Sequence, residues 1–243
     1  MTVGAARQEL QTREPWRDVL WLARHDIRRD WVGYLTSAAY MLVLGSLLAP
    51  GFPNDDVRWG SEIAFLAMVF IMTQPFFSRD YMSWENDRVA ARLTFLRMLP
   101  IPVEVILRGR MLALVAAGIV NVPAFFIPLY LLGDWPFGVG PYIAFVLFWT
   151  GISLIGTGYG LSMEMAVSVR RYTLTNLVVI LVVIAVLTVT GIAAELWLVT
   201  WSVERVAEHP VLMAVAGPLV GMVACVAFGR LATDRLRRRE LTP

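Results

Sequence analysis

The chain has 243 residues, of which 58% are hydrophobic and 16% are charged, a composition far from that of a soluble domain. Its formal net charge is only +2, and its single cysteine, Cys225, excludes a disulfide within the chain. Apolar runs recur that are close to the roughly 20 residues a helix needs to cross a hydrocarbon core. The composition therefore indicates an integral membrane protein and leaves no room for a separate soluble domain.

The apolar runs predict six membrane-spanning helices. They lie near 32–49, 61–78, 111–132, 141–163, 173–196 and 211–229. Unbroken apolar runs favour helices, because a transmembrane strand would alternate apolar and polar side chains. The expected fold class is an all-α membrane protein: a flexible N-terminus at 1–15, an amphipathic interfacial helix at 16–31, a transmembrane domain at 32–229 and a basic tail at 230–243.

The basic residues are divided unequally between the two sides that these spans define. All 21 are arginines, and only Arg58 and Arg205 fall on the side opposite to the rest. Basic residues close to spans stay in the cytoplasm. Both termini are therefore expected to be cytoplasmic, and the expected location is the plasma (inner) membrane of a bacterium.

Segment 16–31 predicts an amphipathic helix ahead of the first span. Its apolar positions make one stripe at helical spacing: Trp16, Val19, Leu20, Ala23, Ile27 and Trp31. The arginines of the segment lie mostly off that stripe. A tryptophan-edged, arginine-rich helix is typical of the membrane interface. Two interpretations stay open, a plain topology anchor and an elbow that receives force from a cytoplasmic partner.

The longest cytoplasmic loop, 79–110, predicts a helix, a sharp corner and a second helix. An apolar stripe occupies the first helix: Val89, Leu93, Leu96 and Leu99. Pro100 and Pro102 end that helix, and a helical pattern resumes at Val103. Apolar side chains beside a rigid corner can fill a groove on another protein, so the loop is expected to be a docking surface.

Three further patterns concern packing and the outer surface. Trp197, Trp201 and Glu204 stand at helical spacing within 195–210, which predicts a short outer amphipathic or re-entrant helix, with an ordinary interfacial loop as the alternative. Asn121 lies beside Pro123 and Pro128, where it either packs at a kink or faces a pathway. Two pairs of small residues permit close helix approach: Gly156 with Gly160, and Gly217 with Gly221.

The topology and the 79–110 loop resemble the membrane subunit of the type-2 ATP-binding-cassette exporters, the ABC-2 type permeases. These permeases have an elbow helix, six spans with both termini inside, a coupling helix between spans two and three, and an outer re-entrant helix before span six. Segments 16–31 and 195–210 match the elbow and the re-entrant helix. The coupling-loop pattern is matched by Glu85, Arg92–Leu96, Leu99-Pro100, Glu104 and Arg108-Gly109-Arg110. The resemblance covers nearly the whole chain.

This resemblance implies a permease that works with a second permease copy or homologue, membrane lipid and a cytoplasmic ATPase subunit, and that exports an amphipathic drug, lipid or peptide. ATP and Mg²⁺ would be bound by the ATPase, because this chain has no Gly-x-x-x-x-Gly-Lys loop. No cofactor bound directly, no metal and no nucleic acid is expected. The residues expected to couple to the ATPase are Glu85, Arg92, Leu96, Arg97, Leu99, Pro100, Ile101 and Glu104.

A substrate path is expected between two copies, near the inward faces of spans two and five. Aromatic and methionine side chains adapt to amphipathic ligands, although ordinary helix packing also explains them. The candidate path residues are Phe70, Met72, Gln74, Phe76, Phe77 and Asn176.

Other function classes fit the sequence less well. His25 and His209 fall on opposite sides of the membrane, so they cannot share a metal or catalytic site. An ion-coupled carrier would place charges near the bilayer midplane, whereas Glu62, Glu164 and Glu195 stand at span ends. We expect no catalytic residues and no enzyme activity. A non-transporting scaffold or immunity-type protein is the remaining alternative.

Overall fold

The computed structural model describes residues 15–52, 58–72, 87–99, 101–195 and 197–238. Within these ranges the chain is helical and contains no strand, which confirms the all-α class. The helices are α2 (Pro15–Arg29), α3 (Trp31–Leu48), α4 (Arg58–Ile71), α6 (Arg88–Met98), α7 (Val103–Leu132), α8 (Val139–Glu164), α9 (Val169–Ala194), α10 (Leu198–Glu208) and α11 (Pro210–Arg238), and a 3-10 turn, η1 (Ala49–Gly51), follows α3.

Five of the described helices are long and apolar enough to cross a membrane, namely α3, α7, α8, α9 and α11. The second predicted span, 61–78, corresponds to α4, which has 14 residues up to Ile71. The rest of that span lies outside the described residues. The described helices therefore fit a membrane protein, and a sixth span stays a prediction.

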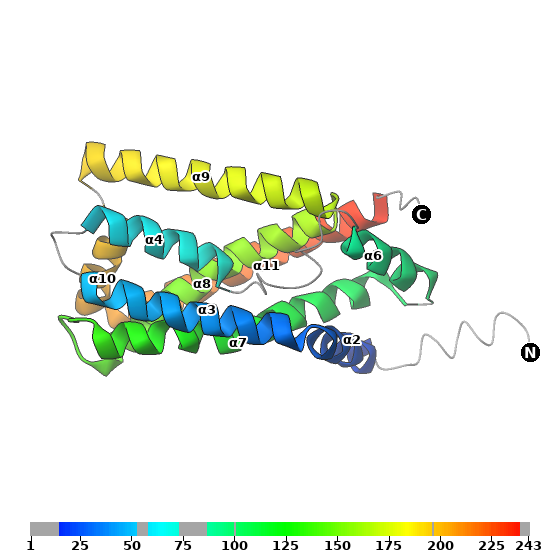
Figure 1. Ribbon diagram of the computed structural model, residues 1–243, viewed down its shortest axis with the longest axis horizontal. Helices are drawn as coiled ribbons and strands as arrows, with labels where there is room; N and C mark the ends of the chain where they lie inside the picture. The colour runs from blue at the N-terminus through cyan, green and yellow to red at the C-terminus, as the bar shows by residue number, and fades with distance from the viewer. Residues whose placement is uncertain (1–14, 53–57, 73–86, 100, 196, 239–243) are drawn as a thin grey trace, which may run out of the picture.

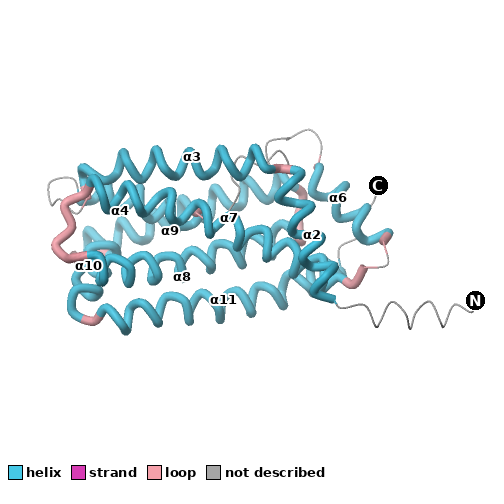
Figure 2. Tube along the Cα trace, turned by 90° about the horizontal axis from the view of Figure 1, so that it is seen from below, coloured by secondary structure: helices cyan, strands magenta, loops and turns pink. Residues whose placement is uncertain are grey.

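The long helices run side by side along the long axis of the molecule (Figures 1 and 2). The short helix α10 lies at one end, called here the α10 end, and α2 and α6 lie at the other, called the α6 end. The beginning of α2 and the end of α11 both lie at the α6 end (Figure 1). Both described chain ends therefore lie at the same end of the bundle.

Several boundaries differ from those expected. The helix predicted at 16–31 corresponds to α2, which ends at Arg29, and Trp31 begins the apolar helix α3. The sixth apolar run was expected to end at Gly229, but α11 continues as helix to Arg238, because no proline or other helix-breaking residue follows that glycine. The corner in the 79–110 loop is confirmed, since α6 ends at Met98 and α7 begins at Val103.

The helices α8 and α11 approach each other closely, and glycines make that approach possible. A Cβ added to Gly151 would overlap the backbone of Gly217, and one added to Gly217 would overlap the backbone of Phe148. A Cβ on Gly221 would overlap the Gly151 carbonyl. The small-residue pair of span six therefore lies in a helix contact, as its spacing predicts.

An aromatic core fills the half of the bundle nearer to α10. Its largest fully buried side chains are Phe65, Phe125, Phe126, Phe145 and Trp149. The ring of Phe65 lies 5.1 Å from that of Trp149 in an edge-to-face arrangement, which is favourable for aromatic pairs. This core fixes α4, α7 and α8 relative to one another.

Asn121 has a packing role. Its side-chain Nδ2 donates a 2.9 Å hydrogen bond to the backbone carbonyl of Met72, just after α4. Both Asn121 and the bond are buried. A buried polar group must find a partner in an apolar setting, so the amide ties the interior of α7 to the end of α4.

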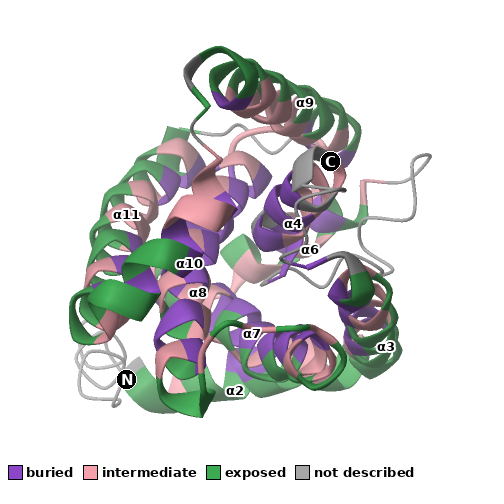
Figure 3. Cartoon of the chain, turned by 90° about the vertical axis from the view of Figure 1, so that its left-hand side faces the viewer, coloured by how far each residue is buried: buried purple, intermediate pink, exposed green. Residues whose placement is uncertain are grey.

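The helix α9 is the least covered of the five long apolar helices, with only 6% of its most apolar window buried. Figure 3 shows it at the margin of the bundle, with exposed residues over most of its surface. Its large exposed apolar side chains are Leu174, Leu177, Val178, Leu181, Val182, Val186, Val189 and Ile192, and Arg170 and Arg171 are exposed in its first turn. A helix that is apolar on its exposed sides suits a lipid environment.

Candidate functional site

Four charged side chains from four helices meet at the α6 end and are called here the ion cluster: Asp26 of α2, Arg92 of α6, Arg110 of α7 and Glu164 of α8. Arg92 bonds both acids, with Nη1 3.3 Å from Asp26 Oδ1 and Nη2 3.1 Å from Glu164 Oε1. Arg110 does the same, with Nη1 3.3 Å from Asp26 Oδ2 and Nε 3.2 Å from Glu164 Oε1. Each guanidinium thus bridges both carboxylates.

The ion cluster is buried and electrically balanced. The side chains of Asp26, Arg92, Arg110 and Glu164 are 15%, 10%, 6% and 2% exposed. Two arginines and two carboxylates sum to zero charge, so each buried charge has opposite charges as neighbours. Removing one partner from such a group leaves an uncompensated charge and is strongly destabilising. The cluster therefore holds the ends of four helices in one arrangement.

A second link at the α6 end is made by Asp87, the N-cap of α6. Its Oδ1 accepts a 2.9 Å hydrogen bond from the backbone N–H of Ala90, within the first turn of α6. Its Oδ2 accepts a 3.3 Å bond from the backbone N–H of Val169, where α9 begins. One carboxylate therefore serves two helix N-termini, where negative charge is stabilising, and it joins α6 to α9.

The two faces of α6 differ in what they contact. Val89 and Leu93 are buried in a core shared with α7, α8 and α11, and Leu96 packs at its edge. On the opposite side, Phe95 is 61% exposed and Met98 is 76% exposed. The helix is thus anchored through one face and leaves two large apolar side chains uncovered at the other.

The predicted coupling residues are distributed over several environments. Glu85 and Pro100 lie outside the described residues. Arg92 is in the ion cluster, and Leu96 and Ile101 pack against the chain's own core, while Leu99 is partly buried. Arg97 is exposed, and Glu104 forms an ion pair with Arg237 near the end of α11.

The sequence reasoning missed the partners of Arg92 and the uncovered apolar pair on α6. Phe95 and Met98 could have been found from their three-residue spacing, which places them together and away from Val89, Leu93 and Leu96. Nothing in the sequence pairs Asp26 with Arg92, because the two lie 66 residues apart. The ion cluster is a product of the tertiary fold.

Most of the candidate path residues have side chains outside the described part of the chain. Gln74, Phe76 and Phe77 lie outside the described residues, and the side chain of Phe70 is not described. Met72 is fully buried. Asn176 is partly buried on α9, close to the side chain of Tyr172.

At the α10 end, a buried carboxylate holds the short helix α10. Glu62 of α4 is 3% exposed. Its Oε2 accepts from Val199 N at 2.9 Å, and its Oε1 accepts from the backbone N and Oγ1 of Thr200 at 2.6 and 2.8 Å. The Trp149 indole N–H also donates to Ser202 Oγ at 3.0 Å. The helix predicted within 195–210 therefore exists, and it is tied to α4 and α8.

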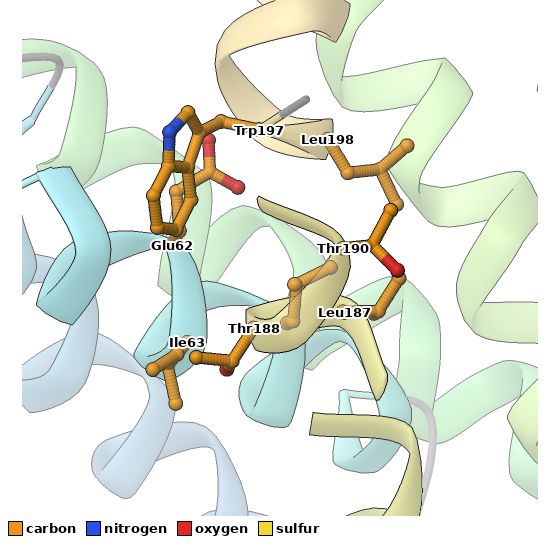
Figure 4. A pocket seen from close by; sticks show the side chains of 8 residues that line it. Glu62, Ile63, Leu187, Thr188, Thr190, Trp197 and Leu198 are labelled. Atoms are coloured by element: carbon orange, nitrogen blue, oxygen red, sulfur yellow. The ribbon is translucent and has the colours of Figure 1, made fainter. Parts of the chain in front are cut away.

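A small cavity of about 50 Å³ lies beside Glu62, between α4, α9 and the beginning of α10. Figure 4 shows Trp197 next to Glu62, with Thr188 and Thr190 of α9 on another wall. The lining is mostly apolar, and the three donors from α10 already occupy the Glu62 carboxylate. This space suits water molecules and is too small for an amphipathic substrate.

No protein-family model matches the chain, and no curated protein matches it. Within the described residues, no group of three or more histidine, cysteine, aspartate or glutamate side chains could hold a metal ion. What distinguishes the α6 end is a short helix fixed by buried ion pairs.

Proposed function

We propose that this chain is the permease subunit of an ATP-binding-cassette exporter in the plasma membrane, with α6 as the element on which a separate ATPase docks. ATP and Mg²⁺ would be bound by that ATPase, and the permease would work as a pair of membrane subunits. The chain itself would have no enzyme activity.

The observation that supports this proposal is the setting of α6. This helix has 11 residues, too few to cross a bilayer, and it lies at the end of the bundle (Figure 1). Its inner face is fixed by the ion cluster and by the core around Leu93. Its outer face presents Phe95 and Met98, and large apolar side chains in such positions are typical anchors of protein interfaces.

The contacts of α6 would let it transmit a displacement. Arg92 joins it to α2 and α8, and Asp87 joins it to the beginning of α9. Through Arg110 the same carboxylates hold α7. A partner that shifts α6 during its ATPase cycle would therefore pull on four other helices together, because charged hydrogen bonds hold a fixed geometry.

The test is binding of the purified chain to an ATP-binding-cassette ATPase from the same genome. Phe95→Ala with Met98→Ala should weaken binding about tenfold or more, since truncating interface anchors commonly has effects of this size. The matched control is Leu177→Ala with Leu181→Ala, two exposed apolar residues of α9. Equal affinity of the wild type and the α6 double variant would reject α6 as the docking element.

The proposed substrate is amphipathic, because the long helices offer apolar surfaces with few charges. Its path would lie between the two permease copies, near spans two and five. Asn176→Ala should then change which compounds stimulate the partner ATPase while basal hydrolysis stays the same. If no amphipathic compound stimulates hydrolysis in proteoliposomes, the chain is a scaffold that binds an ATPase.

A further inference from the structure

The elbow helix α2 presents three different surfaces around its axis. Successive residues of an α-helix are rotated by about 100°. Val19 and Leu22 form the buried face, which packs on α7 near Gly109 and continues to Asp26. The adjoining face exposes the apolar side chains Trp16 and Leu20. Only the first of these faces has a partner within the chain.

The third surface is a basic row that consists of Arg17, Arg24 and Arg28, with Trp21 among them. The spacings of four, seven and eleven residues from Arg17 place all four side chains within one narrow stripe of the helix. All four are exposed. None of the three arginines forms an ion pair with a described residue, and no acidic residue lies within the stripe.

The order of these surfaces matches the layers of a membrane interface. The exposed apolar face lies beside the basic row, so burying Trp16 and Leu20 in the acyl boundary would bring the row to the level of the headgroups. The first span, α3, begins two residues after α2, with an exposed Trp31. Amphipathic helices with this distribution lie in the interface and bind anionic lipid.

We infer that Arg17, Arg24 and Arg28 form a binding site for the headgroup phosphates of anionic phospholipids. Guanidinium groups bind phosphate oxygens through charge-assisted, bidentate hydrogen bonds. Trp21 suits the same depth, since tryptophan is enriched at the membrane interface. An acidic protein would match the arginines but would leave Trp16 and Leu20 uncovered, so a lipid surface is the better fit.

Bound lipid would also act on the ion cluster, because α2 carries Asp26 on its opposite face. A headgroup that holds α2 in the interface also holds Asp26 against Arg92 and Arg110. Anionic lipid should therefore raise the melting temperature of the chain, and Asp26→Asn should remove most of that rise while leaving lipid binding intact. A lipid site on α2 requires only that the chain lies in a bilayer, so it is independent of the proposed ATPase partner.

The test uses the full chain in nanodiscs of mixed phosphatidylglycerol and phosphatidylcholine, with the lipids that stay bound identified by native mass spectrometry. The wild type should retain phosphatidylglycerol preferentially. The triple variant Arg17→Gln, Arg24→Gln, Arg28→Gln should lower that preference about tenfold or more, since each arginine near an anionic surface contributes severalfold. High salt should lower it as well.

Two controls make the result specific to α2. The first control is a triple variant that removes the same charge from exposed arginines of α9 and α11: Arg170→Gln, Arg171→Gln, Arg230→Gln. It should leave the preference for phosphatidylglycerol unchanged. The triple Arg→Lys variant of the basic row keeps the three charges but not the bidentate geometry, so it should retain only part of the preference, and it also shows that the helix tolerates substitution. The proposed site would be overturned if both glutamine variants lost the preference for phosphatidylglycerol equally, or if neither lost it. Displacement of the bound lipid by soluble glycerol phosphate would overturn it as well.

Discussion

Arg92 and Glu164 are 72 residues apart in the sequence, yet their side chains meet in a buried ion pair at 3.1 Å. The carboxylate is the last residue of a long apolar helix, and the guanidinium belongs to a short helix outside the membrane spans. Charges at such low exposure are stable only with close partners. This pair therefore ties the movement of α6 to that of α8.

Neutralising one member of the ion cluster should destabilise the chain. Glu164→Gln leaves Arg92 and Arg110 facing a single carboxylate, so the buried cluster gains a net charge of +1. Breaking a buried pair in this way costs about 3 kcal/mol or more. The free energy of unfolding should fall accordingly in a detergent-based unfolding titration of the purified chain.

The matched control for this substitution is Arg205→Gln. Arg205 pairs with Glu208 on α10, and both side chains are about half exposed, at 49% and 56%. Exposed pairs contribute no more than about 1 kcal/mol, so this variant should unfold nearly like the wild type. Similar losses in Glu164→Gln and Arg205→Gln would contradict the buried character of the cluster.

A single added methyl group in the contact between α8 and α11 should destabilise the chain. In Gly151→Ala the new Cβ would overlap the backbone of Gly217, and overpacking of this kind costs about 1–3 kcal/mol or more. Gly229→Ala is the control, because a Cβ there meets no atom within 4 Å and alanine favours the helix. Thermal unfolding should show a lower midpoint for Gly151→Ala only, and equal midpoints would mean that the two helices do not touch there.

Removing the carboxylate of Glu62 should free the beginning of α10. Glu62→Ala leaves the N–H groups of Val199 and Thr200 without their acceptor, and buried donors that lose a partner cost about 1–3 kcal/mol. Hydrogen exchange at these two amides should become faster. The control variant is Glu204→Ala, at an exposed position on α10. If exchange at the two amides is as slow in Glu62→Ala as in Glu204→Ala, Glu62 does not cap α10.

The proposed topology places the α6 end in the cytoplasm and the α10 end outside. In a Cys225→Ala background, Glu204→Cys on α10 should react in intact cells with a thiol reagent that does not cross membranes. Arg238→Cys, at the end of α11, should react only after the cells are permeabilised, although this residue is exposed. Labelling of Arg238→Cys in intact cells would reverse the orientation.

The sequence predicted the helical class and the position of most long helices because about 20 consecutive apolar residues are a strong local signal. It also predicted the proline corner between α6 and α7, and the close contact at Gly217 and Gly221. These features depend on neighbouring residues, so a single sequence contains them. The boundary at Trp31 was missed because an interfacial helix and a span can join without a proline or glycine between them.

The site was predictable only in part, for a physical reason. Arg92 and Leu96 both looked like surface residues of an amphipathic helix, yet tertiary packing buries the first among carboxylates and partly buries the second. Which arginine meets which carboxylate depends on helix ends far apart in the sequence. Phe95 and Met98 were overlooked because the stripe that faces the core was taken for the docking surface.

The most direct test of the central claim is photocross-linking from α6 in living cells. A photoreactive amino acid at Phe95 should capture an ATP-binding-cassette ATPase, identified by mass spectrometry through its Walker motif peptides, and the same amino acid at Leu181 of α9 should not. Capture of that ATPase at Phe95 alone is the result that the proposed permease function predicts. If Phe95 captures no ATPase, or if Leu181 captures it equally well, α6 is not the coupling element.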